Sequence, residues 1–194
     1  MANYLFLDMD GVLNSNNLIK EWIDNKEKEL QEKHPDLSYR AIYTNVRQAF
    51  GEEFKHSSEL IFPSLVSILN RVLEEADIKI IWSTTWRIIR EYRDIDRARE
   101  MLTRRGIDGK RLVGYTPDLS YFRLPSHEIR VDEIRNTITN KQFGLCKKSL
   151  IGVLDDMDLT ALNNGRNIKV FKTHIDTGIT PDIAEDMLNF YKGK

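Results

Sequence analysis

The residues best suited to chemistry in this chain are acids and hydroxyls that directly follow short apolar segments. Three such pairs stand out: Asp8 and Asp10 after residues 4–7, Ser83 and Thr84 after residues 78–82, and Asp155 and Asp156 after residues 150–154. Four ionised carboxylates in one cleft would repel one another and raise each other's pKa values. Such a group either keeps some of its protons or surrounds a hard cation, and carboxylate and carbonyl oxygens suit Mg²⁺.

Each pair taken alone also has an ordinary structural explanation. The Asp-x-Asp-Gly sequence at residues 8–11 could be a turn, because Asp and Gly are preferred turn residues. Asp155 and Asp156 could cap a helix that follows a strand, and Ser83-Thr84 could simply begin a helix. Their shared position after an apolar segment favours a common site over three separate explanations.

The three apolar segments are predicted to be strands of one parallel sheet. They are too short for helices and almost free of polar residues, which is typical of strands buried on both faces. Residues 168–171, nearer the sheet edge, and residues 111–115 are further strand candidates. Because the carboxyl ends of parallel strands meet at one edge, where ligands bind, we expect the four carboxylates and Ser83 to lie together there.

Helical patterns fill the gaps between the predicted strands. An apolar stripe of helical period follows Pro63, which suits the first turn of a helix. Residues 95–102 indicate a second helix, closed by Gly106. Residues 131–138 and 181–191 indicate two more. Strands that alternate with helices predict an α/β fold with a doubly wound sheet and right-handed crossovers.

Residues 14–60 interrupt this alternation with two predicted helices, at residues 18–34 and 38–50. A connection of this length inside a compact domain is usually functional. We interpret it as a small helical cap inserted into a single domain that spans residues 1–194. A solvated helical hairpin that has no role in substrate binding is the alternative.

Composition narrows the classes of protein that this chain can belong to. The formal net charge of -1 gives no global attraction to nucleic acids or to acidic membranes. The single cysteine, Cys146, excludes an intrachain disulfide and suits the reducing cytoplasm. We see neither a signal peptide nor an apolar run of about 20 residues that could cross a bilayer. There is also no GxxxxGK[ST] segment, so we expect no ATP-driven kinase half.

Residues 4–13 resemble the first motif of the haloacid dehalogenase (HAD) superfamily, a strand followed by Asp-x-Asp-Gly. Residues 80–83 resemble its second motif, a strand that ends in Ser or Thr, and residues 150–156 resemble its fourth, a strand that ends in paired acids. The motifs occur in the right order and span nearly the whole chain. The resemblance implies a Rossmann-like three-layer sandwich with a mostly parallel sheet.

The third motif of the superfamily is a single basic residue, for which Arg130 is our first choice. We expect Arg130 to open the helix that precedes the last motif strand. Lys147 and Lys148 compete for this role, although they lie just before that strand, at its end away from the site. A surface arginine in the first turn of a helix is the plain alternative.

Several short segments are similar to one branch of the superfamily, the HAD domains associated with Swiss army knife RNA-repair proteins. These segments are residues 83–87, 130–134, 154–156, 171–173 and 177–180. Val131 departs from the pattern, which has a glycine after the arginine, and the insertion at residues 14–60 is long for this branch.

The resemblance implies a magnesium-dependent phosphomonoester hydrolase in which Asp8 attacks phosphorus and forms an aspartyl-phosphate. Asp10 would protonate the leaving oxygen and later take a proton from water. The resemblance also implies that Mg²⁺ is held by Asp8, the backbone carbonyl of Asp10, Asp155 and Asp156. It further implies that the phosphoryl oxygens are bound by Ser83, the Thr84 N–H and Arg130.

Substrate and partners are less constrained by the sequence. Residues 87–111 contain nine basic and five acidic residues. This local excess of positive charge could attract a phosphorylated nucleic-acid end, with Arg87 as a possible substrate contact. The alternative is that this segment is a solvated helix with internal ion pairs and that the substrate is a small phosphorylated molecule. We interpret Trp86 as a packed residue. Nothing in the sequence indicates a protein partner or a membrane.

Three other functions remain open on the same motifs. A phosphomutase would return the phosphate to a sugar, a phospho-aspartate switch would not turn over, and a binding protein would keep only the fold. A receiver-type switch carries its paired acids on the first strand and its phosphorylated Asp on a middle strand. The order here is the reverse, which argues against a receiver.

Overall fold

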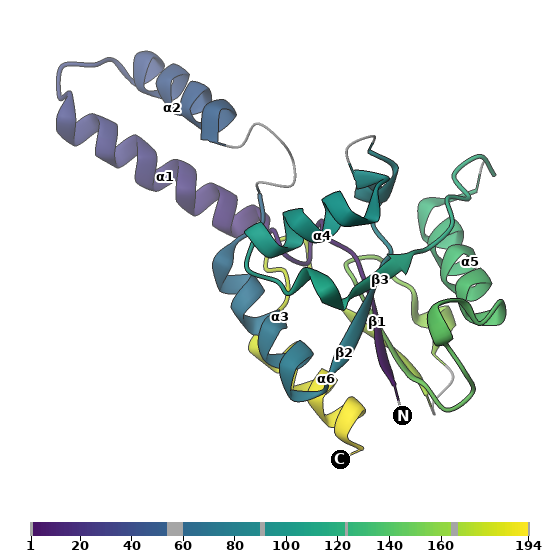
Figure 1. Ribbon diagram of the computed structural model, residues 1–194. Coiled ribbons are helices and arrows are strands. Elements are labelled where there is room, and N and C mark those ends of the chain that lie inside the picture. Colours follow the sequence, from purple (N-terminus) through teal and green to yellow (C-terminus); the bar gives the residue numbers. More distant parts are fainter. Residues whose placement is uncertain (1, 54–59, 90–91, 123, 164–166, 194) are drawn as a thin grey trace.

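A five-stranded parallel sheet forms the centre of the molecule, in the order β3-β2-β1-β4-β5 (Figure 1). The computed structural model describes residues 2–53, 60–89, 92–122, 124–163 and 167–193. The strands are β1 (Asn3–Leu7), β2 (Ile78–Trp82), β3 (Leu112–Tyr115), β4 (Leu150–Asp155) and β5 (Ile168–Lys172). All five strand predictions are confirmed.

The buried strands β1, β2 and β4 lie at the middle of the sheet, as their apolar sequences predict. The predicted edge position of β5 is also confirmed, and β3 forms the opposite edge. Strand β3 begins one residue later than predicted because Arg111 ends the 3₁₀ turn η4 (Gly109–Arg111). The guanidinium of Arg111 donates to the carbonyl of Ile78, at 3.1 Å.

Two hydrophobic clusters pack on opposite faces of the sheet and make the fold a three-layer α/β sandwich. In β1, Leu5 and Leu7 belong to one cluster, and Tyr4 and Phe6 belong to the other, as the alternation of side chains along a strand requires. Helices α3 (Pro63–Glu75), α4 (Ile95–Arg104) and α6 (Pro181–Lys192) cover the first face, and α5 (Ser126–Thr139) with the 3₁₀ turn η6 (Thr160–Leu162) covers the second (Figure 1). This arrangement confirms the Rossmann-like prediction.

The helix ends follow the predicted capping residues except in α5. Pro63 occupies the first turn of α3, and Gly106 follows α4 with a left-handed φ of +86°. Helix α5, however, begins at Ser126, so Arg130 lies in its second turn. The expectation that Arg130 opens this helix is wrong, because the helix starts directly after Pro125.

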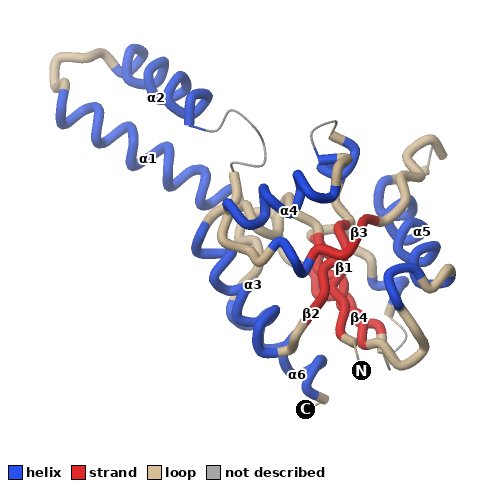
Figure 2. Tube along the Cα trace, viewed as in Figure 1, coloured by secondary structure: helices blue, strands red, loops and turns tan. Residues whose placement is uncertain are grey.

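Helices α1 (Asn16–Lys33) and α2 (Tyr39–Glu53) form a pair that projects away from the sheet (Figures 1 and 2). No residue of α1 is buried, whereas Ile42 and Val46 of α2 are buried. The rings of Trp22 and Phe50 meet edge to face, with their centroids 5.4 Å apart. The two predicted helices are therefore present, and their role as a cap stays a prediction.

No helix within the described residues is long and apolar enough to cross a lipid bilayer.

Candidate active site

The carboxyl ends of β1, β2 and β4 bring the predicted site residues to one edge of the sheet. The ladder continues one residue beyond two of these strands, because the Asp8 N–H donates to Leu154 O at 3.0 Å and the Ser83 N–H donates to Leu7 O at 2.9 Å. Strand order reverses between β1 and β4, which is where ligands bind in open α/β sheets. Asp8 and Asp155 stand on the two sides of this switch point.

Asp8, Asp155 and Asp156 form a carboxylate cluster in which one oxygen of each residue lies within 4.8 Å of the others. Asp8 and Asp155 are buried, and Asp156 is half-buried. Asp155 Oδ1 accepts the N–H of Met157 at 2.9 Å, but Asp155 Oδ2 is buried and has no hydrogen-bond partner among the described residues. The charged group nearest to this oxygen is Arg130 Nη1, at 3.5 Å, and a cation with oxygen ligands would suit the cluster as a whole.

The carboxylate of Asp10 is held apart from this cluster. Asp10 is exposed, and its two oxygens accept the Trp86 indole N–H at 2.8 Å and the Asn14 side-chain amide at 3.0 Å. The side-chain oxygen of Asn14 in turn accepts the N–H of Gly11 at 2.7 Å. Trp86 is packed, as predicted, but its link to Asp10 and the contribution of Asn14 were not anticipated from the sequence.

Gly11 allows the loops after β1, β4 and β5 to approach closely. Its φ is +66°, and a Cβ atom at this position would lie 2.6 Å from Asp156 Oδ2. The carbonyl of Gly11 accepts the hydroxyl of buried Thr173 at 2.7 Å. Glycine is therefore required here both for the turn and for the position of Asp156.

Arg130 is the basic residue that the fold brings to the cluster. It is only 4% exposed, and its Nη1 lies 3.6 Å from Asp8 Oδ1 and 3.5 Å from Asp155 Oδ2. The same nitrogen donates to the Ser83 hydroxyl at 3.4 Å. Lys147 and Lys148 are exposed and precede β4, at the other end of the strand, so they do not join the site.

Glu133 joins Arg130 to a second buried arginine, Arg87. Glu133 Oε1 lies 2.5 Å from Arg87 Nη2 and accepts the Leu119 N–H at 3.0 Å, and Oε2 lies 3.8 Å from Arg130 Nε. Both side chains of the Arg87–Glu133 pair are less than a tenth exposed. The sequence indicated Arg87, but Glu133 was missed. Its position three residues after Arg130, on one helix face, was the available signal.

The sequence of this chain matches a known protein family. A match to the family described as "HAD domain in Swiss Army Knife RNA repair proteins" covers residues 4–184. The chain belongs to this family. The sequence-based assignment to this branch is therefore confirmed.

A solved structure of a haloacid dehalogenase-like hydrolase from Streptococcus pneumoniae is also similar to this HAD domain. Its sequence is 17% identical, the match covers 98% of this chain and 90% of that chain, and the TM-score is 0.42. No curated protein matches the sequence.

Ser83 and Thr84, which directly follow β2, lie at the same edge of the sheet as the carboxylate cluster. Ser83 and Thr84 are both buried. Thr84 caps the 3₁₀ turn η2 (Thr85–Ile88), where its hydroxyl oxygen accepts the Trp86 N–H at 3.3 Å. Burial raises the pKa of Asp8, and a hydrogen bond from the Thr84 side chain acts in the opposite direction and lowers it.

Without a bound cation, burial disfavours the ionised forms of the carboxylates in the cluster. Burial raises the pKa of Asp8 to about 7, against the lowering effect of Arg130, and the Asp155 charge raises it further. Burial also raises the pKa of Asp155 to about 6, again opposed by Arg130, and it raises the pKa of Asp156. The single guanidinium of Arg130 therefore does not compensate the cluster fully.

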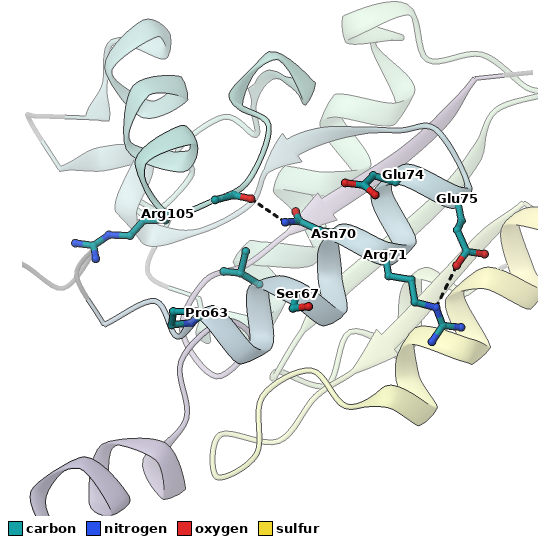
Figure 3. Close-up of a pocket in the computed structure, with 9 residues that line it drawn as sticks. Pro63, Ser67, Asn70, Arg71, Glu74, Glu75 and Arg105 are labelled. Carbon is teal, nitrogen blue, oxygen red and sulfur yellow. Dashed lines mark hydrogen bonds and ion pairs between the residues drawn. The ribbon is translucent and has the colours of Figure 1, made fainter.

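An open hollow of about 570 Å³ on the outer surface of α3 lies elsewhere on the molecule (Figure 3). None of the predicted site residues lines it. Several of its polar groups are engaged with protein partners, since Arg71 pairs with Glu75 and the Asn70 amide donates to Gly106 O. We assign no function to this hollow.

The raised pKa values predict a link between pH, Mg²⁺ and stability. An unfolded Asp ionises near pH 3.8, whereas Asp8 and Asp155 in the folded protein keep protons up to a pH of about 7 and about 6. Between these values the folded state binds more protons, so the free energy of unfolding of the metal-free protein falls as pH rises. We therefore expect Mg²⁺ to raise the Tm by several degrees more near pH 8 than near pH 5.

Thermal unfolding with and without Mg²⁺ at the two pH values measures this link. Asp8→Asn is the control, because it removes one ionising group and should reduce the pH dependence of the metal-free protein. An equal Mg²⁺ effect at both pH values would contradict the electrostatic description of the cluster.

Proposed function

We propose that this protein is a magnesium-dependent phosphomonoester hydrolase that acts through an aspartyl-phosphate on Asp8. The observation that carries the proposal is the convergence of Asp8, Asp155 and Asp156 within 4.8 Å, beside the buried Arg130. A reactive carboxylate, a candidate cation site and a fixed positive charge thereby occupy the same edge of the sheet.

The donor set of the cluster fits Mg²⁺. Asp8, Asp155 and Asp156 would hold the ion, together with the backbone carbonyl of Asp10 that the family resemblance implies. Asp155 Oδ2, whose nearest charged group is Arg130 Nη1 at 3.5 Å, is available as a ligand. When bound, Mg²⁺ would offset the repulsion between the Asp8 carboxylate and an anionic phosphate.

In the first step, an oxygen of Asp8 attacks phosphorus while the bond from phosphorus to the leaving oxygen breaks. Arg130, the Ser83 hydroxyl and the Thr84 N–H bind the phosphoryl oxygens as charge develops on them. Asp10 donates its proton to the leaving oxygen, which departs as an alcohol. The product of this step is the aspartyl-phosphate on Asp8.

In the second step, water attacks the phosphorus of the aspartyl-phosphate. Asp10, now ionised, takes a proton from that water, and the bond from phosphorus to the Asp8 oxygen breaks. Inorganic phosphate leaves, and the Asp8 carboxylate and the Asp10 proton are restored. Trp86 and Asn14 hold the Asp10 carboxylate for both transfers.

The segment 14–60 is proposed as the cap of this site. Asn14, which binds both Asp10 and the Gly11 N–H, lies two residues before α1. Ser15, between them, caps α1 by accepting the Leu18 N–H. A movement of α1 and α2 would therefore be transmitted to Asp10 through Ser15 and Asn14.

Phosphorylated nucleic-acid ends are the proposed natural substrates, as the description of the family suggests. The positive charge of residues 87–111 is only weak support for this proposal, because Arg87 is already paired within the protein. Arg87 is paired with Glu133, so Arg87→Ala would remove the closer of the two arginine partners of this buried carboxylate and cost stability. Arg90, the next arginine of the segment, lies outside the described residues.

A panel of phosphomonoesters tests the proposed activity. We expect release of inorganic phosphate from 3′- or 5′-phosphorylated RNA or DNA, dependent on Mg²⁺ and lost in Asp8→Asn. This substitution preserves the size of the side chain and removes the nucleophilic charge. Return of the phosphate to a second hydroxyl without net release would indicate a phosphomutase. A single-turnover phosphorylated state would indicate a switch.

The role of Asp10 predicts a specific effect of Trp86→Phe. This change removes one of the two donors to the Asp10 carboxylate, so we expect kcat to fall about tenfold, part of the roughly 10²–10⁴-fold typical of a general acid–base. KM should change little, because Trp86 holds the proton donor rather than the phosphate.

Trp82→Phe is the matched control for this measurement. The Trp82 indole N–H is buried but has no hydrogen-bond partner within the described parts of the chain. Its removal should leave kcat within about twofold of the wild-type value. Equal losses of kcat in the two variants would show that general packing, and not the bond to Asp10, is responsible.

A further inference from the structure

A cavity of about 140 Å³ lies beside the carboxylate cluster, between η2 and α5. Two residues that line it contact the cluster directly. Arg130 approaches Asp8 and Asp155, and the Met157 N–H donates to Asp155 Oδ1. A group bound in this cavity would therefore adjoin the proposed reaction centre.

The buried part of the cavity wall is nearly balanced in charge. Arg87 pairs with Glu133, and Arg130 is shared among Glu133, Asp8 and Asp155. The wall therefore lacks the surplus positive charge that a second phosphate would need.

The remaining wall combines aliphatic side chains with small hydrogen-bonding groups. Its members are Ile88, Ile129 and Met157 on the apolar side, and Thr85, Asp118, Ser120 and Ser126 on the polar side. Aliphatic groups pack against the C–H face of a saturated ring, while hydroxyls and a carboxylate bind its hydroxyl groups. No aromatic side chain among the described residues lines the cavity, so a nucleobase would have no stacking partner there.

The volume of the cavity limits the size of its ligand. An apolar protein cavity of about 150 Å³ accommodates one benzene ring. The cavity beside Asp8 therefore holds one ring and not a complete nucleoside.

We propose that this cavity receives the leaving group of the phosphomonoester, and that the leaving group is a single saturated ring with several hydroxyl groups, the size of a pentose. This inference rests on the proposed function. A ribose at a phosphorylated end would occupy the cavity, and its base would remain outside.

Three primary-alkyl phosphates test this preference under the same leaving-group chemistry: methyl phosphate, benzyl phosphate and ribose 5-phosphate. We expect kcat/KM for ribose 5-phosphate to exceed the other two by about tenfold or more, the effect of one or two well-formed hydrogen bonds. Equal values for the three substrates would overturn the cavity proposal and leave the proposed hydrolase activity intact.

Ser126→Trp blocks the cavity and provides the decisive variant. Ser126 is the exposed first residue of α5 and follows the N-cap residue Pro125, so the fold should tolerate the change. We expect the preference for ribose 5-phosphate over methyl phosphate to fall to near unity. The matched control is Ser64→Trp, an exposed serine in the first turn of α3 that does not line the cavity. A preference that survives in Ser126→Trp contradicts the proposal.

Binding of free ribose separates failure of the cavity from failure of the chemistry. Titration of the Mg²⁺-loaded protein with ribose should shift the backbone NMR signals of Ile129 and Met157, and Ser126→Trp should abolish these shifts. Shifts without hydrolysis of any phosphomonoester would sink the proposed function and retain the cavity. An absence of shifts would overturn the cavity proposal.

Discussion

The central physical constraint of the site is the repulsion between two buried carboxylates, Asp8 and Asp155. Neighbouring parallel strands hold these side chains close together. Burial and mutual repulsion both oppose ionisation, and Arg130 offsets only part of this cost. Strands β1 and β4 can keep the two side chains together because the sheet is hydrogen-bonded on both sides of β1 and packed on both faces. A cation bound at this edge of the sheet would relieve the repulsion between the two carboxylates, which is why we propose a metal site there.

Glu133 contacts Arg130 and connects it to other segments of the chain. Glu133 contacts Arg87 in the turn η2, Arg130 in its own helix and the Leu119 N–H in the loop after β3. The position of Arg130 therefore depends on three parts of the chain that are remote from Asp8 in sequence. The same group of residues forms the wall of the cavity proposed for the leaving group. The same contacts therefore compensate the charge of the carboxylate cluster and form the wall of the proposed cavity.

The sequence predicted the strands and the main acids because both depend on local patterns. An apolar segment followed by Asp or Ser is visible without any knowledge of contacts, and the parallel order of the strands then places those residues at one edge. The bond from Trp86 to Asp10 joins segments 76 residues apart, and nothing in either local sequence specifies it. Glu133 was missed for a similar reason, because a Glu in a helix is usually on the exposed face and its burial is fixed by Arg87. The start of α5 was misplaced because residues 126–130 lack a clear apolar stripe.

The central claim is that Asp8 and Asp155 bind one divalent ion between them. The most direct measurement is an anomalous difference map from a crystal grown with Mn²⁺, which accepts the same oxygen ligands as Mg²⁺. The account predicts a single strong peak in contact with the carboxylates of Asp8 and Asp155, and its loss in Asp155→Asn. A map with no peak between these carboxylates at saturating Mn²⁺, or a peak that persists in Asp155→Asn at an unrelated position, would contradict it.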